Sequence, residues 1–117
     1  MLMEAGFICR DAKKFQEARE LFAGVRALLP KSDAPEVALG TVFFQQSDFD
    51  TAITHYKKAL EKNPRSAFAY AHLGEAYLFK LEKVKARPYL QKAVELDARG
   101  SSGSMARNLL ILAESLR

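Results

Sequence analysis

The feature that most constrains this chain is the return of the same small residues at intervals of 34 positions. The recurring sets are Gly6, Gly40 and Gly74; Ala18, Ala52 and Ala86; and Pro30, Pro64 and, with proline replaced, Ala98. A fixed period of this length indicates one structural unit written three times. The 117 residues are 49% hydrophobic, which is enough for one continuous core and leaves no room for a second.

Each unit has the pattern of two helices. In the middle copy, apolar residues at helical spacing surround Gly40, a polar break follows at residues 46–48, and a second periodic stretch runs from Ala52 to Pro64. A bulky side chain at Gly40 or Ala52 would separate the paired helices, so the small residues predict a close approach there. Each unit is therefore predicted to be a helical hairpin that ends at its proline.

These residues resemble the tetratricopeptide repeat. The middle copy, residues 33–66, matches the motif at Leu39, Gly40, Phe43, Ala52, Tyr56, Ala59 and Pro64. The third copy, residues 67–100, matches at Tyr70, Leu73, Gly74, Tyr77, Ala86, Leu90 and Ala93. The first copy, residues 1–32, is incomplete at its N-terminus and keeps Gly6, Ala18, Phe22 and Pro30. The resemblance implies an all-α fold, a right-handed superhelical α-solenoid of three helical hairpins in one domain over residues 1–117.

A last helix is expected at about residues 104–116, after the Gly-Ser stretch at residues 100–104. Its apolar face contains Met105, Leu109, Leu112, Ala113 and Leu116. Such a helix would cap the exposed end of the stack. The alternative is that the flexible Gly-Ser stretch lets the helix swing into a groove or onto a neighbouring molecule.

The sequence indicates no enzyme, because it offers no converging set of catalytic groups and no glycine-rich phosphate loop. His55 is expected to be solvated, and His72 could face a groove. We expect no metal site and no cofactor. The net charge of +4 comes from basic residues interrupted by acids, which is typical of a solvated outer face. Nucleic-acid binding is therefore not expected, and acidic partners or lipid headgroups are a secondary possibility.

The N-terminal residues are too polar for a membrane span, since Arg10 and Asp11 follow a short apolar stretch. The only cysteine, Cys9, excludes an internal disulfide. We expect a cytoplasmic protein.

The resemblance implies that the first helix of each hairpin lines the concave side of the stack. The family's inner-facing positions also include Arg10 and Asp11 in this chain. The candidate groove residues at these positions are Met3, Phe7, Val37, Ala38, Thr41, Phe44, Gln45, Phe68, Ala71, His72, Glu75, Leu78 and Phe79.

The candidate groove is unusually apolar. Some members of the family hold a terminal carboxylate with lysine and asparagine at these positions, which this chain replaces mostly with apolar side chains. A carboxylate would lose its water without gaining a cation. Four aromatic rings are expected to form a continuous apolar surface, those of Phe7, Phe44, Phe68 and Phe79. The alternative is that some of them pack between repeats, as is expected for Phe43, Tyr56, Tyr77 and Tyr89.

The predicted function is non-catalytic binding of an apolar or amphipathic helical segment of a partner protein in this groove. Small size, three repeats and an apolar groove are similar to the tetratricopeptide chaperones of bacterial type III secretion systems. Two alternatives remain open. One is a general adaptor or assembly factor, and the other is self-association, such as a homodimer in which a helix of one copy fills the groove of another.

Overall fold

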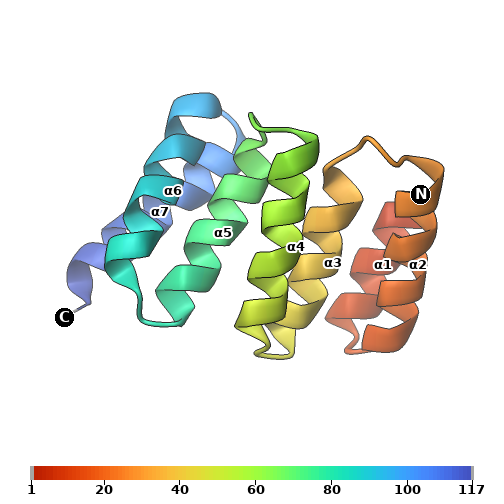
Figure 1. Ribbon diagram of the computed structural model, residues 1–117. Coiled ribbons are helices and arrows are strands. Elements are labelled where there is room, and N and C mark those ends of the chain that lie inside the picture. Colours follow the sequence, from red (N-terminus) through yellow and green to blue (C-terminus); the bar gives the residue numbers. More distant parts are fainter. Residues whose placement is uncertain (1, 117) are drawn as a thin grey trace.

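The computed structural model describes residues 2–116, which form seven α-helices and no strand. The helices are α1 (Leu2–Asp11), α2 (Phe15–Leu28), α3 (Ala34–Gln45), α4 (Phe49–Lys62), α5 (Ala67–Phe79), α6 (Lys83–Leu96) and α7 (Ser101–Ser115). Helices α1 to α6 pair into three hairpins that stand side by side in chain order, and α7 lies at the end of the row (Figure 1). The predicted all-α solenoid is confirmed.

The recurring glycines lie where the two helices of each hairpin meet. A methyl group at Gly40 would overlap the ring of Tyr56 in the facing helix. The equivalent pairs in the other hairpins are Gly6 with Phe22 and Gly74 with Leu90. The close approach predicted from the sequence is therefore present in all three hairpins, because only a residue without a Cβ leaves room for the facing side chain.

The turn inside each hairpin uses the same backbone device. One residue just after each first helix adopts a left-handed conformation: Lys13, Ser47 and Leu81 have φ angles of 64°, 62° and 63°. A left-handed residue ends a helix and reverses the chain in a short turn. Because these three residues are one period apart, the hairpins repeat in geometry as well as in sequence.

Two side-chain caps order the start of the later helices. The Asp48 carboxylate accepts a hydrogen bond from the Thr51 amide, and the Ser66 hydroxyl oxygen accepts one from the Ala69 amide. Ser66 also donates to Asp33 at 2.5 Å. This bond ties the start of α5 to the start of α3 and so fixes the spacing of successive hairpins.

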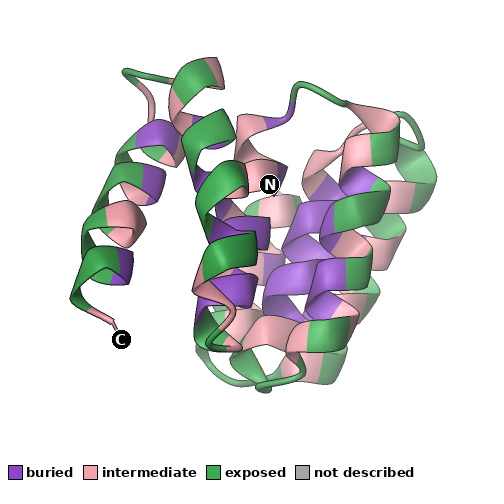
Figure 2. Ribbon diagram, turned by 60° about the vertical axis from the view of Figure 1, so that its left-hand side comes forward, coloured by how far each residue is buried: buried purple, intermediate pink, exposed green. Residues whose placement is uncertain are grey.

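The last helix begins at Ser101, three residues earlier than the Gly-Ser stretch indicated. Gly103 lets α7 pack closely against the end of α6, because a methyl group at this position would overlap the backbone of Asp97. The Asp97 carboxylate also accepts a hydrogen bond from the Ser102 amide. Helix α7 packs against α5 and α6 and buries Gly103, Ala106 and Ala113 (Figure 2). The Gly-Ser stretch therefore starts a packed helix.

The core consists of two groups of buried side chains that meet at α3. One group joins α1, α2 and part of α3 around Phe22, and the other joins α3 to α7 around Tyr56, Leu73 and Leu90. Of the rings expected in the core, Tyr56 and Tyr77 are buried, whereas Phe43 and Tyr89 are half-buried.

Candidate functional site

A small open cavity lies on the face formed by the first helices α1, α3 and α5. It has a volume of about 190 Å³ and is lined by Arg10, Thr41, Phe44, Gln45, His72 and Glu75. We call it the central cavity. Five of these six side chains are polar, and they come from all three hairpins. A ligand bound in this cavity would therefore contact all three hairpins.

Hydrogen bonds across the hairpins hold the polar side chains of the central cavity. Arg10 donates to the Thr41 hydroxyl oxygen at 2.9 Å and to the Asp11 carboxylate at 3.0 Å. The Arg10 hydrogen bond and charge, with a further hydrogen bond from Gln45, lower the pKa of Asp11. On the other wall, the His72 Nδ1 lies 3.3 Å from Glu75. The cavity thus presents a guanidinium on one side and a carboxylate on the other.

Tyr56 lies beside this cavity, with its ring 5.7 Å from the His72 ring. Burial raises the pKa of the Tyr56 hydroxyl, and the negative charge of Glu75 acts in the same direction. The hydroxyl therefore stays protonated at neutral pH. It has no hydrogen-bond partner among residues 2–116. The sequence placed Tyr56 in the core, which is correct for its ring, but gave no indication of the charged groups near it.

An aromatic cluster adjoins the central cavity. The Phe44 ring lies 5.0 Å from that of Phe79 and 5.2 Å from that of Phe49, and Phe79 is 50% exposed. Phe79 also lines an apolar cavity of about 200 Å³ together with Leu78, Leu81, Leu112 and Leu116. The first-helix face is therefore polar in its centre and apolar where α5 meets α7.

The other candidate groove residues are less accessible than expected. Val37, Ala38 and Ala71 are fully buried, and Leu78 and Thr41 are nearly so. Helix α3 stands between α1 and α5 and also contacts α2 and α4, so its neighbours cover side chains that position alone assigned to an open groove. The expectation that Val37, Ala38 and Ala71 line an open groove is therefore wrong.

Two of the four phenylalanines pack within the stack. The Phe7 ring lies 5.1 Å from the buried Phe22 ring, and the Arg10 guanidinium lies 4.9 Å from the centre of the Phe7 ring. Phe68 contacts the His72 ring edge-on at 5.0 Å. Both are half-buried, so they support the walls of the face more than they open onto it. Phe44 and Phe79 are the pair that the structure brings together next to the central cavity.

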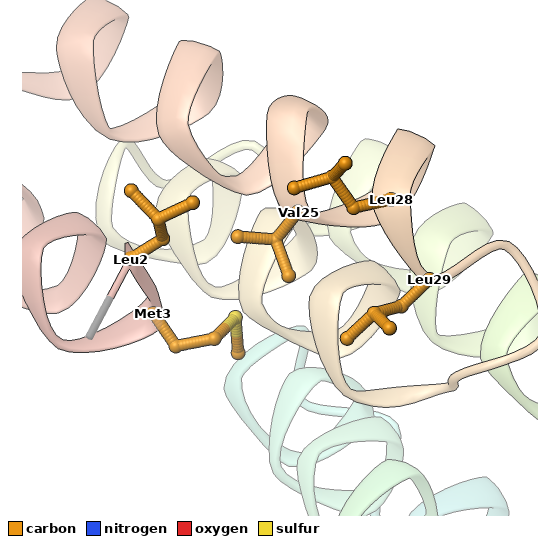
Figure 3. A pocket seen from close by; sticks show the side chains of 5 residues that line it. All are labelled: Leu2, Met3, Val25, Leu28 and Leu29. Atoms are coloured by element: carbon orange, nitrogen blue, oxygen red, sulfur yellow. The ribbon is translucent and has the colours of Figure 1, made fainter.

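Met3 lines a separate apolar cavity where α1 begins and α2 ends. This cavity has a volume of about 360 Å³ and is formed by Leu2, Met3, Val25, Leu28 and Leu29 (Figure 3). Leu28 and Leu29 are largely exposed. Met3 therefore does not share a site with Phe44 and Phe79.

His55, which was expected to be solvated, is instead bound to a buried carboxylate. Its Nδ1 lies 2.9 Å from Glu36, which is 3% exposed. Arg26 and Lys62 approach the same carboxylate at 3.4 and 3.5 Å. Burial raises the pKa of Glu36, but the hydrogen bond from His55 and the charges of the three partners outweigh it, so the pKa lies below its usual value. The expectation was wrong because an isolated histidine gives no sign of a partner in another helix.

Within residues 2–116, no group of three or more histidine, cysteine, aspartate or glutamate side chains is arranged to hold a metal ion. None of the helices in the described part of the chain is both long and apolar enough to cross a membrane.

The chain matches two family models of the repeat. One, described as a TPR repeat, matches residues 40–79, and the other, a tetratricopeptide repeat, matches residues 69–99. Together they cover residues 40–99, from the middle of α3 to the end of α6. They leave the first hairpin, the start of α3 and all of α7 outside the matched residues.

Solved structures share the fold over nearly the whole chain. The first TPR domain of Spaghetti, bound to an HSP90 peptide, has a TM-score of 0.85 at 19% identity, covering 97% of this chain and 90% of that one. The Yersinia enterocolitica type III secretion translocator chaperone SycD has a TM-score of 0.79 at 20% identity, covering 97% and 81%. PcrH, in complex with the chaperone-binding region of PopD, has a TM-score of 0.80 at 18% identity, covering 97% and 89%. At such identities the likeness establishes the shared fold.

Proposed function

Because this chain belongs to the tetratricopeptide repeat family, we propose that it is a non-catalytic scaffold that binds a segment of another polypeptide on the face formed by α1, α3 and α5. The observation that carries the proposal is the half-exposed Phe79 ring, packed on Phe44 beside the polar central cavity. An exposed aromatic ring next to convergent hydrogen-bonding groups is typical of a binding site.

The chemistry of this face defines the segment that it would hold. An apolar side chain of the partner would pack on Phe44 and Phe79, and burying about 150 Å² there would contribute roughly 4 kcal/mol before the entropy of association is subtracted. Arg10 and Glu75 would then contact polar groups of the same segment. An amphipathic helix or an extended segment with alternating apolar and polar side chains satisfies both requirements.

We propose more specifically that the partner is an aggregation-prone protein kept soluble before secretion. The support is the fold shared over nearly the whole chain with the type III secretion translocator chaperone SycD and with PcrH, together with exposed apolar side chains near both ends of the stack. The alternatives are an adaptor or assembly factor with the same face, and self-association through the apolar cavity of Figure 3.

A photo-crosslinking amino acid at position 79 tests the binding face. We expect it to capture a protein from the native lysate, and the same amino acid at position 58 in α4 to capture none of it. The crosslinked segment, made as a peptide, should bind the purified chain at micromolar concentration or below. Phe79→Ser should weaken that binding about tenfold, whereas Val84→Ser, which removes another exposed apolar side chain, should not. Equal effects of the two substitutions would refute the proposed face.

Co-expression with the captured protein distinguishes the chaperone from its alternatives. A chaperone should keep its partner soluble in a complex of defined stoichiometry, and the partner should aggregate when Phe79→Ser replaces the wild type. An adaptor should bind a partner that is already soluble alone. For self-association, light scattering of the purified chain should show a dimer that Leu28→Ser dissociates.

A further inference from the structure

A larger cavity opens between the second helices α4 and α6. It has a volume of about 550 Å³ and is lined by Lys57, Tyr77, Lys85, Pro88 and Tyr89. None of these residues lines the central cavity. We call it the α4–α6 cavity.

The charged groups in the lining of this cavity are both positive. The ammonium groups of Lys57 and Lys85 lie 5.8 and 5.9 Å from the centre of the Tyr77 ring. Lys85 pairs weakly with Glu82, at 3.8 Å and with its side chain 65% exposed. Lys57 has no carboxylate partner among residues 2–116, and the proximity of the Tyr77 side chain raises the pKa of Lys57. The cavity therefore has a positive potential that the protein itself leaves largely uncompensated.

The aromatic side chains in the cavity are already stacked on one another. The rings of Tyr77 and Tyr89 are nearly parallel, with centroids 5.5 Å apart, and Tyr77 is almost fully buried. A nucleic-acid base would need an open ring face on which to stack, and this pair does not provide one. What remains is an apolar wall, extended by Pro88, between two ammonium groups. A carboxylate on a short aliphatic chain fits this arrangement.

We propose that the α4–α6 cavity binds aspartate or glutamate side chains of an acidic segment in a partner polypeptide. A flat anionic membrane fits less well, because Glu61 and Glu95 are exposed on the same two helices and interrupt the positive surface. The site is separate from the face proposed above, so the chain would contact a partner on two surfaces or contact two partners.

Binding of a fluorescein-labelled, N-acetylated hexaglutamate peptide tests the site. We expect saturable binding by fluorescence anisotropy at about 50 mM salt, where screening is weak, and none for a hexaglutamine peptide. The double variant Lys57→Gln, Lys85→Gln should bind hexaglutamate about tenfold more weakly. The control variant Lys58→Gln, Lys92→Gln removes the same charge from the same two helices outside the cavity, and its affinity should fall less than about threefold.

Three results would overturn the proposal. One is a lack of saturable hexaglutamate binding by the wild type. Another is an equal loss in the two double variants, which would mean that net charge alone attracts the peptide. The third is that phosphatidylserine vesicles or a single-stranded oligonucleotide bind more tightly than hexaglutamate, and that this binding depends on Lys57 and Lys85. Phe79→Ser should leave hexaglutamate binding unchanged, so failure here and failure of the proposed binding face are distinguishable. All four lysines are exposed, and circular dichroism should show both double variants folded.

Discussion

The contact between α3 and α4, inside the second hairpin, differs in chemistry from the contact between α5 and α6, inside the third, although both use the same repeat positions. We call these two contacts the first junction and the second junction. The first is built on Glu36 and His55, and the second has Tyr70 and Tyr89 one period later. The equivalence extends to their neighbours: Arg26 and Lys62 in the first junction correspond to Leu60 and Leu96 in the second. One junction is thus an ion cluster around a buried carboxylate, and the other is an apolar and aromatic contact.

The stacking geometry is nevertheless preserved. His55 lies parallel to the Phe43 ring at 5.3 Å, and Tyr89 lies parallel to the Tyr77 ring at 5.5 Å. The second and third hairpins therefore share a flat side chain at this position and tolerate either polarity around it, whereas the first hairpin has Leu21 there. The difference matters for stability. A buried ion pair must overcome the cost of removing its charges from water, whereas an aromatic contact is stabilised when its apolar surface leaves water.

Truncating the flat side chain at the two junctions should give the largest contrast. We expect Tyr89→Ala to lower the free energy of unfolding by about 3 kcal/mol, because it removes a half-buried ring and leaves a void. His55→Ala should cost about 1.5 kcal/mol, since Arg26 and Lys62 remain on Glu36. Urea unfolding measures both. Tyr89→Phe is the control and should lose less than about 1 kcal/mol; equal losses for the two alanine variants would remove the contrast.

Neutralising the buried carboxylate should have the next largest effect. Glu36→Gln should destabilise the chain by about 2 kcal/mol at pH 7. This is less than the cost of breaking a fully buried ion pair, because Arg26 and Lys62 are partly exposed and can regain water. The exposed Glu61→Gln is the matched control and should change the stability by less than about 0.5 kcal/mol. A loss for Glu36→Gln no larger than for Glu61→Gln would show that the ion cluster does not stabilise the junction.

Grafting the second junction onto the first should be stabilising. The variant Arg26→Leu, Glu36→Tyr, His55→Tyr, Lys62→Leu replaces the ion cluster by the residues found one period later, and we expect a gain of about 1 kcal/mol. Glu36→Tyr alone should instead destabilise, because it leaves three basic side chains without the carboxylate. Thermal unfolding of both variants provides the measurement. A less stable graft would mean that the first junction needs its charges for reasons other than polarity.

The smallest effect expected is a pH dependence confined to the first junction. The pKa of Glu36 is lower in the folded chain than its ordinary value of 4.5. Its ion pairs therefore stabilise the fold above about pH 4.5 and lose this effect as the pH falls through the folded pKa. The difference in unfolding free energy between wild type and Glu36→Gln should shrink by about 1 kcal/mol or less between pH 5 and about pH 3. A constant difference over this range would contradict the ion-cluster account.

The sequence predicted the repeat and its helices well, because the steric requirement for a small residue at Gly40 and its equivalents is visible in the sequence itself. It also placed the flat rings at Tyr56 and Tyr77 in the core. It failed where a side chain's surroundings depend on the packing of another helix. His55 shows this failure, since its partner Glu36 lies 19 positions away in another helix, and Val37 shows it too, because flanking helices close over it.

The sequence by itself determined the hairpin, its period and the direction in which each helix faces, since these follow from local sterics and from spacing along one helix. Only the tertiary structure decided which of those faces stays open. Whether a first-helix residue such as Phe79 is exposed or one such as Ala38 is sealed depends on how closely the adjacent hairpins pack. That distance is set by contacts between residues far apart in the chain, and no local pattern records it.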